Sequence, residues 1–305
     1  MILETDALPL EDAGTKRRAA DFLALTKPRV VAMVLVTTLV GYYLGATSAP
    51  IEYLRVLATL IGTALAAGGT LTLNQFMERD LDARMHRTRE RPLPDGRIAP
   101  TDALAFGAAL TIGGIVYLAL AVDPLTALVT AATTAIYLFG YTPLKPRTSL
   151  CSVVGAIPGA LPPLAGWTAA RGELGLGAWV LFAIMFLWQI PHSLAIARLY
   201  REDYARAGIR LLPVIEPDGA STGRQIVTHS LALMVVALLP TLIGVAGAVY
   251  FFTSLALGLG LLAASLRLAR SASAADARRL LLASLIYLPF LLVTMAADKV
   301  PVSPW

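Results

Sequence analysis

Long apolar stretches alternate with short charged segments along most of the chain. Each stretch is long enough to cross a membrane as an α-helix, because about 20 apolar residues span the hydrocarbon core of a bilayer. The pattern therefore predicts an all-α integral membrane protein with nine transmembrane helices. We expect them near residues 30–48, 56–79, 102–121, 124–141, 149–170, 176–200, 225–246, 248–267 and 280–297.

The seventh and eighth helices are predicted from one uninterrupted stretch. Residues 225–266 contain no Lys, Arg, Asp or Glu. At about 1.5 Å per residue, this stretch is about twice as long as one crossing needs. We therefore expect two helices that turn near Gly244–Gly247.

The positions of the basic residues indicate how the chain crosses the membrane. If the N-terminus is cytoplasmic, 22 of the 25 Lys and Arg residues fall in inside segments, and only Arg55, Arg171 and Lys299 fall outside. This asymmetry follows the positive-inside rule and predicts a plasma (inner) membrane protein whose C-terminus is outside. The net charge of +5 then reflects topology and contact with the anionic lipid bilayer, not nucleic-acid binding.

The loops suggest how the domain is organised. Residues 1–27 are polar and mixed in charge, so we expect a mobile cytoplasmic arm without a secretory signal peptide, followed by a single membrane domain over 28–305. The long charged loops at 78–100 and 198–224 lie four helices apart, which predicts two four-helix pseudo-repeats plus one helix. The single cysteine, Cys151, excludes an intramolecular disulfide and a cysteine-based zinc site.

One polar stripe is predicted at the inner end of the second helix. Asn74, Glu78 and Asp82 are spaced i, i+4, i+8, which places three oxygen-bearing side chains on one helix face. Such a set suits a hard cation such as Mg²⁺, which typically bridges protein carboxylates to phosphate. Three arginines that follow the stripe are candidates to bind the diphosphate oxygens: Arg84, Arg87 and Arg91. The alternative is that these charges are interfacial anchors and ion pairs.

Two further segments add candidate residues. Pro191 is expected to kink the sixth helix; if the helix then resumes, His192 and Asp203 lie on nearly the same face, and the two polar stripes enclose a pocket open to the cytoplasm. His192 is either a hydrogen-bonded structural residue or an axial contact to a haem iron. Lys145 and Arg147 lie on a short inside loop and can add cations to a diphosphate site. The glycines and prolines of 155–166 predict an irregular fifth helix that lines a cavity or packs closely.

These residues together indicate a membrane enzyme that acts on a lipid diphosphate. A diphosphate held by Mg²⁺ and arginines is a good leaving group, and an allylic lipid chain ionises to a carbocation without a protein nucleophile. A site at the membrane boundary suits a substrate whose tail stays in lipid.

The chain resembles the UbiA superfamily of intramembrane prenyltransferases, whose first signature is an Asn followed by acids four and eight residues later. Here these are Asn74, Glu78 and Asp82, with RTRERPL at 87–93, and Glu78 stands where Asp is usual. The second signature departs from the usual aspartates and instead contains WQIPHS and EDYARAGIRLLP. With LTKPR at 25–29, YTPLK and GALPPLAGW, this variant is similar to the members that farnesylate haem B.

The resemblance implies a UbiA-like fold and a defined reaction. The farnesyl group of farnesyl diphosphate is transferred to a vinyl group of haem B, water adds, and haem O and diphosphate result. Both acidic signatures would hold Mg²⁺, so Asp203 would act with Asn74, Glu78 and Asp82, while His192 would serve the haem. A haem A synthase or an oxidase assembly factor is the protein partner that this chemistry suggests.

Two other functions stay open at this stage. One is prenyl transfer to a quinone precursor or another aromatic acceptor, which the His192 segment disfavours. The other is secondary transport, which also uses repeats and intramembrane charges. A transporter would place its charges near the bilayer midplane, whereas the charges here gather at the inner surface.

Overall fold

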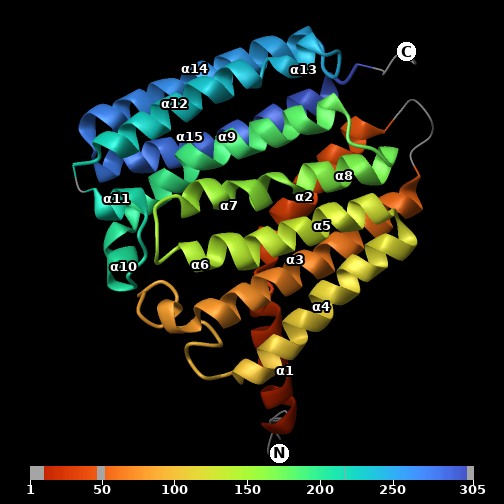
Figure 1. The fold of residues 1–305 in the computed structure, drawn as a ribbon, viewed down its shortest axis with the longest axis vertical. Coiled ribbons are helices and arrows are strands. Elements are labelled where there is room, and N and C mark those ends of the chain that lie inside the picture. The colour runs from red at the N-terminus through yellow and green to blue at the C-terminus, as the bar shows by residue number, and fades with distance from the viewer. Residues whose placement is uncertain (1–9, 47–51, 217, 301–305) are drawn as a thin grey trace, which may run out of the picture.

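Nine helices cross the membrane within the residues described, which are 10–46, 52–216 and 218–300 of a computed structural model (Figure 1). Each expected range overlaps one of them, so the predicted number of crossings is confirmed. The spans are Pro28–Gly45, Tyr53–Asp82, Pro100–Ala121, Pro124–Leu144, Cys151–Arg171, Leu176–Leu199, Ala220–Leu242, Ala248–Ser271 and Ala274–Ala297.

Several spans consist of more than one helical element. The elements, in chain order, are α1 (Leu10–Leu25), α2 (Pro28–Gly45), α3 (Tyr53–Asp82), α4 (Pro100–Ala121), α5 (Pro124–Ala135), the π-helix η1 (Ile136–Tyr141), α6 (Thr142–Leu144), α7 (Cys151–Ala160), α8 (Pro162–Arg171), α9 (Leu176–Leu199), α10 (Arg201–Arg206), α11 (Leu212–Ile215), α12 (Ala220–Val236), α13 (Leu239–Leu242), α14 (Ala248–Ser271) and α15 (Ala274–Ala297).

Local sequence explains where the helices begin. Pro28, Pro100 and Pro124 each open a helix, where proline's missing N–H is not needed. Before α5, Asp123 is the N-cap, and its Oδ1 accepts hydrogen bonds from the backbone N–H of Leu125 at 2.7 Å and of Thr126 at 3.2 Å. These bonds satisfy donors that a helix leaves unpaired.

The long apolar stretch divides as expected. α13 ends at Leu242, and α14 begins at Ala248. Gly244, between them, has φ +73°, a left-handed conformation that favours glycine. The predicted turn near Gly244–Gly247 is therefore confirmed.

The fifth span is broken and closely packed at the same time. α7 ends at Ala160 and α8 begins at Pro162, so the helix is interrupted at Leu161. In α8, a Cβ on Gly166 would clash with the carbonyl oxygen of Thr38 on α2. The two interpretations of this segment, irregular helix and close packing through small residues, both hold.

The outer surface of the bundle is apolar. Large side chains on different spans are mostly exposed, among them Leu120 at 84%, Phe139 at 75% and Phe252 at 68%. A surface of this kind is stable against lipid rather than water. With nine apolar spans, it identifies a multi-pass membrane protein.

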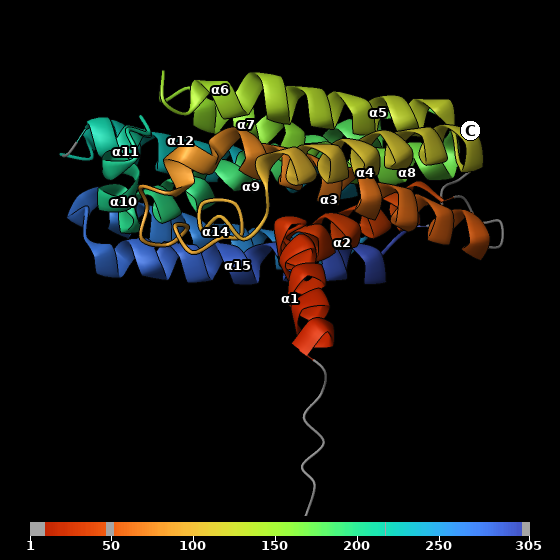
Figure 2. The same cartoon turned by 90° about the horizontal axis from the view of Figure 1, so that it is seen from below.

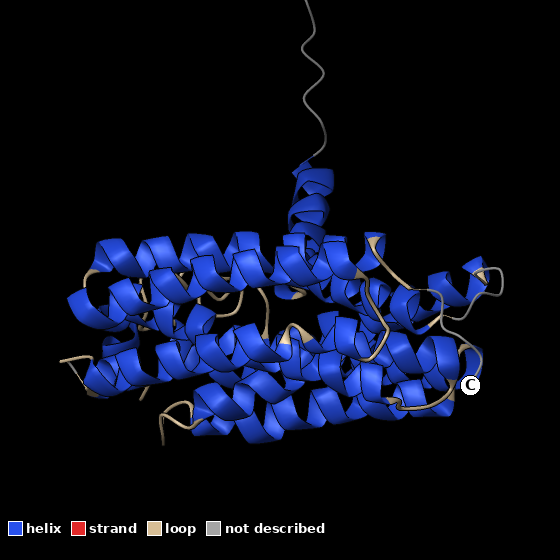
Figure 3. Ribbon diagram, turned by 90° about the horizontal axis from the view of Figure 1, so that it is seen from above, coloured by secondary structure: helices blue, strands red, loops and turns tan. Residues whose placement is uncertain are grey.

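Three of the short elements lie at the same end of the bundle (Figure 1). α6, α10 and α11 lie at the end where α3 finishes (Figure 1). The views from below and above show the other helices as a bundle from which α1 projects (Figure 2, Figure 3). The expected mobile arm thus contains a helix, α1. This helix is connected to the bundle by the fully buried Leu25 and by the ion pair of Asp21 with Arg97.

Candidate active site

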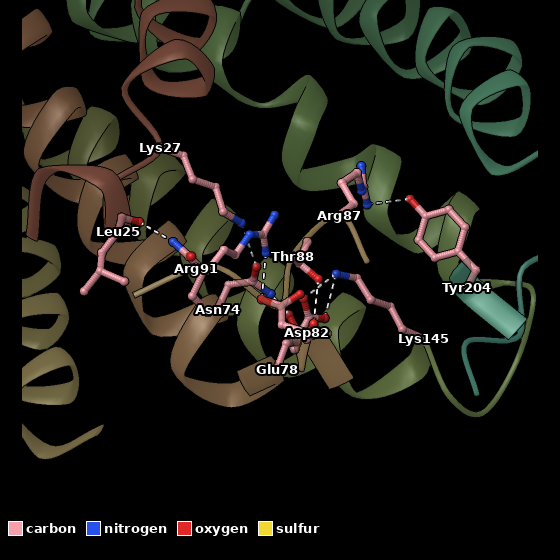
Figure 4. Close-up of polar contacts among 12 residues, drawn as sticks. Leu25, Lys27, Asn74, Glu78, Asp82, Arg87, Thr88, Arg91, Lys145 and Tyr204 are labelled. Carbon is pink, nitrogen blue, oxygen red and sulfur yellow. Dashed lines mark hydrogen bonds and ion pairs between the residues drawn. The ribbon is translucent and has the colours of Figure 1, made fainter. Parts of the chain in front are cut away.

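Three buried oxygen-bearing side chains lie on the last turns of α3. Asn74, Glu78 and Asp82 are only 1%, 8% and 2% exposed, and α3 continues to Asp82, as their common face requires. The chain then folds back, because the hydroxyl of Thr88 donates to the backbone carbonyl of Asp82 at 2.8 Å. The three side chains of the predicted polar stripe are therefore buried together at the end of α3 (Figure 4).

Each of these side chains has a cationic neighbour from another segment. The Nζ of Lys27 lies 3.4 Å from the Oδ1 of Asn74, and the guanidinium of Arg91 donates to Asp82 at 2.7 Å. The Nζ of Lys145 donates to the Oε2 of Glu78 at 2.8 Å. Buried charges require such partners, since removing one leaves an uncompensated charge that costs about 3–5 kcal/mol.

Lys27 is the residue of this cluster that sequence reasoning did not assign. It is the N-cap of α2 and adopts φ 50° and ψ 66°, a left-handed conformation that is uncommon outside glycine. Burial lowers the pKa of Lys27 from 10.5 to about 7, with further repulsion from Arg91 and Lys145. Its position just before a helix-opening proline, in LTKPR, was the available signal.

Lys145 is fixed through its backbone as well as its side chain. Its carbonyl oxygen accepts a hydrogen bond from the backbone N–H of Arg210 at 2.8 Å. Burial opposes the charge of Lys145, but Tyr141 and Glu78 outweigh burial and raise its pKa above the ordinary value. The Nζ also lies 4.5 Å from the centre of the Tyr141 ring. Lys145 is therefore fixed at both its backbone and its side chain, where it pairs with Glu78.

A cavity of about 460 Å³ lies inside the bundle, and its wall includes Tyr141, whose ring centre is 4.5 Å from the Nζ of Lys145. Thr63, Ala67 and Thr70 of α3 line it, on the face that continues to Asn74 and Glu78. Other lining residues come from α2, α5, η1, α7, α8 and α9, and include Val34, Thr130, Tyr137, Tyr141, Gly155, Pro158, Gln189 and Ile196. The wall is thus largely apolar, and Tyr141 connects it to the charged cluster through Lys145.

The second predicted stripe does not form. α9 ends at Leu199, and Tyr200 leaves the helix with φ −108° and ψ 24° before α10 begins at Arg201. As a result, Asp203 pairs with Arg206 and lines a separate hollow beside Ala272. The structure does not bring Asp203 to the Asn74 cluster or to the cavity.

His192 faces α15 rather than the carboxylates. Its Nδ1 lies 2.8 Å from the Oγ of Ser284, and its ring stacks on Trp188 at 4.7 Å. Because the Ser284 hydroxyl donates to the carbonyl of Leu281, we assign the Nδ1–H as donor, which leaves a lone pair on Nε2. The neighbouring Gln189 and Ser193 line the cavity, whereas His192 is not among its lining residues.

The predicted diphosphate-binding arginines separate into three groups. Arg91 is in the cluster, and Arg87 lines the cavity, where it donates to the phenol of Tyr204 at 3.2 Å (Figure 4). Arg84 and Arg147 are exposed, and within the described residues neither guanidinium pairs with the cluster. The place of Tyr204 in the cavity wall was not foreseen from the sequence.

Comparison with known proteins places this architecture in a family. Residues 34–289 match the UbiA prenyltransferase family. The chain belongs to that family. It is also 49% identical to protoheme IX farnesyltransferase of Solibacter usitatus over 287 residues, which cover 92% of this chain and 98% of the relative.

Solved structures of UbiA proteins share the fold. A digeranylgeranylglyceryl phosphate synthase superposes with a TM-score of 0.78 at 16% identity, over 92% of this chain and 98% of that one. A UbiA homologue from Archaeoglobus fulgidus, bound to GPP and Mg²⁺, superposes with a TM-score of 0.63 at 16% identity, over 90% and 99% of the two chains. At these identities the likeness establishes the fold.

The residues present fit a divalent cation of the kind that this family implies. The Oε1 of Glu78 is buried without a hydrogen bond, although Lys145 Nζ lies 2.6 Å away, because that approach lacks hydrogen-bonding geometry. Asn74 and Asp82 add an amide and a carboxylate oxygen on the same face. Within the described residues no group of three His, Cys, Asp or Glu side chains gathers for a metal. The donor set therefore suits Mg²⁺, which usually takes one or two carboxylates together with substrate phosphates.

Proposed function

We propose that this protein transfers the farnesyl group of farnesyl diphosphate to a vinyl group of haem B. The observation that carries the proposal is a largely apolar intramembrane cavity whose wall residue Tyr141 contacts a buried cluster of carboxylates and cations. The 49% identity to a protoheme IX farnesyltransferase over nearly the whole chain supports the same acceptor.

The chain's own residues account for the ionisation step. The carbon–oxygen bond to the diphosphate breaks and leaves an allylic cation, while the negative charge stays on the departing diphosphate. Lys27, Lys145 and Arg91 lie where they can bind this diphosphate, once it draws them from Asn74, Glu78 and Asp82. Mg²⁺, held by Asn74, Glu78 and Asp82, would neutralise the diphosphate and improve it as a leaving group.

The cavity then determines the course of the cation. Its apolar wall accommodates the hydrocarbon tail and excludes bulk water, which would otherwise capture the cation. The terminal carbon of the haem vinyl group attacks the allylic carbon and leaves a cation on the carbon next to the porphyrin. Water adds there and loses a proton, which gives the hydroxyl group of haem O.

We propose that His192 contacts the haem iron of this substrate. The hydrogen bond to Ser284 holds the proton on Nδ1, so Nε2 is the nitrogen available to a metal. A ligating histidine usually donates its other ring N–H in this way. Gln189 and Ser193, which flank His192 in the sequence, line the cavity. Haem bound to His192 would therefore reach the cavity beside α9.

The orientation of the protein forms part of the proposal. The charge asymmetry supports a cytoplasmic N-terminus, an outside C-terminus and a site that faces the cytoplasm.

Asp203 is not part of the proposed metal site, because its carboxylate pairs with Arg206. A haem A synthase or oxidase assembly partner stays a prediction.

The direct test is mass spectrometry of haems extracted from cells that express this chain. We expect a species heavier than haem B by one farnesyl group plus water, and none in cells with an empty vector. Purified protein in detergent should also release diphosphate when given farnesyl diphosphate and haem B. Turnover with 4-hydroxybenzoate but not with haem B would establish the quinone-precursor reaction instead.

A further inference from the structure

The guanidinium of Arg87 lies close to two aromatic rings, that of Tyr200, which precedes α10, and that of Tyr204 in α10. Its Cζ lies 5.1 Å from the ring centre of Tyr200 and 5.6 Å from that of Tyr204. It also donates a hydrogen bond to the Tyr204 hydroxyl at 3.2 Å. Arg87 follows α3, whereas the tyrosines follow α9, so this contact joins the two long inner loops.

The two loops are also joined by a small apolar cluster. Met85 is buried with Ala207 and Ile209, and Tyr204 and Leu211 pack against them. Both sides of the Arg87 contact are therefore anchored close to it, at Met85 on one loop and around Tyr204 on the other. An arginine fixed in this way loses less conformational entropy when it binds an anion.

The charge of Arg87 is unusual for its surroundings. Among the described residues that line the cavity, Arg87 is the one with a charged side chain. The remaining wall suits a hydrocarbon, so this cation marks the end of the cavity where an anionic group is favoured. The hydroxyl of Tyr204 and the faces of both rings orient the guanidinium without neutralising it.

We propose that Tyr200 and Tyr204 are positioning residues that hold Arg87 ready to bind the diphosphate group of the prenyl substrate. The second half of the chain thus contributes to diphosphate binding through two aromatic rings and a phenol, while Asp203 pairs with Arg206. This inference rests on the proposed function, because it takes the diphosphate from there.

The test is calorimetric binding of inorganic pyrophosphate, with Mg²⁺, to the purified full-length protein in detergent. Arg87→Ala should weaken binding by about tenfold or more, since it removes a charge-assisted hydrogen bond. Tyr200→Leu combined with Tyr204→Leu should weaken it nearly as much, and Tyr204→Phe by a smaller factor. Tyr53→Leu, a change at a 79% exposed tyrosine of α3, is the matched control.

The decisive measurement is a double-mutant cycle. If the tyrosines act through Arg87, their replacement should cause no further loss of pyrophosphate affinity in the Arg87→Ala protein. Additive losses, or unchanged affinity in the tyrosine variants, would overturn the inference. Tyr204→Phe preserves the partly buried ring, so it tests the hydroxyl even where the double leucine variant fails to fold.

The same proteins separate this inference from the proposed function. Haem farnesylation by the wild-type protein, with normal pyrophosphate affinity in the tyrosine variants, would reject the positioning role alone. Coupled losses of pyrophosphate affinity, in a protein that never modifies haem, would support the positioning role and reject haem as the acceptor.

Discussion

The polar side chains at the C-terminal end of α3 each contact a basic side chain from another segment. Asn74, Glu78 and Asp82 are buried, and each contacts a cation from a different part of the chain. Such an arrangement resists both loss of a carboxylate and loss of a cation, because either leaves the partner unbalanced. It also places the cations proposed to bind phosphate and the oxygens proposed to bind the metal within hydrogen-bonding distance of each other.

Replacement of Asp82 tests the carboxylate side of this cluster. Asp82→Ala should lower prenyl transfer about a hundredfold or more, since removing one preorganised group at developing charge has effects of that size. The rate of diphosphate release by purified protein is the measurement. Asp80→Ala, an exposed change on the same helix, is the control and should leave the rate unchanged. Full activity of Asp82→Ala would remove this residue from the site.

Replacement of Lys27 tests the cationic side. Lys27→Met should weaken pyrophosphate binding about tenfold, because it removes a charged hydrogen-bond donor from the cluster. Arg29→Met, at an exposed position two residues later, should have little effect. Calorimetry measures both. Equal affinities for the two variants would show that Lys27 supports the fold rather than the substrate.

His192 and Ser284 should affect haem rather than diphosphate. His192→Ala should weaken haem B binding, measured by optical titration, and leave pyrophosphate affinity unchanged. Ser284→Ala should shift the haem absorption spectrum, since the Nδ1–H then loses its acceptor. Equal losses of haem and pyrophosphate binding in His192→Ala would argue against a haem-specific role.

At the scale of elements, small residues determine how closely the helices approach. α2 crosses α8 where Gly166 faces the backbone of Thr38. α3 and α4 meet at Gly69 and Gly114 in the same way, because a Cβ on either would clash with backbone of the opposite helix. In a membrane, such contacts contribute packing that the hydrophobic effect does not supply.

The α2–α8 crossing can be tested with a single added side chain. Gly166→Val should destabilise the protein by at least about 1–3 kcal/mol, the usual cost of overpacking. The apparent melting temperature in detergent should fall accordingly. Gly113→Val in α4, where no atom lies within 4 Å of an added Cβ, should change it little. Similar melting temperatures for the two variants would contradict the packing argument.

For the whole molecule, the distribution of basic residues supports the proposed orientation in the membrane. The loops that carry the cations lie at the end of the bundle where α3, α10 and α11 meet (Figure 1). From the positive-inside rule we propose that this end faces the cytoplasm. The diphosphate would therefore be bound at the cytoplasmic surface, while the hydrocarbon tail stays at membrane depth.

Cysteine labelling of intact cells tests that orientation. In a Cys151→Ser background, Glu173→Cys should react with a membrane-impermeant maleimide, since 173 lies in an outside loop. Arg89→Cys, in the loop after α3, should react only after the cells are opened. Both positions are exposed, so access to the reagent depends on the side of the membrane. The reverse pattern would invert the proposed topology.

The sequence by itself determined the features that depend on local periodicity. The spans, the turn at Gly244 and the common face of Asn74, Glu78 and Asp82 follow from apolar run length, backbone preference and the 3.6-residue repeat. All three are properties of neighbouring residues. They needed no knowledge of which helices meet.

Only the tertiary structure decided which side chains from distant segments share a site. Lys27 reaches Asn74 across 47 positions, and Arg87 reaches Tyr204 across 117. The pairing of His192 with Asp203 on one face failed because Tyr200 breaks the helix between them. A periodic pattern predicts which residues share a face only within one continuous helix. Where the backbone changes direction, the residues that follow no longer share a face with those before it.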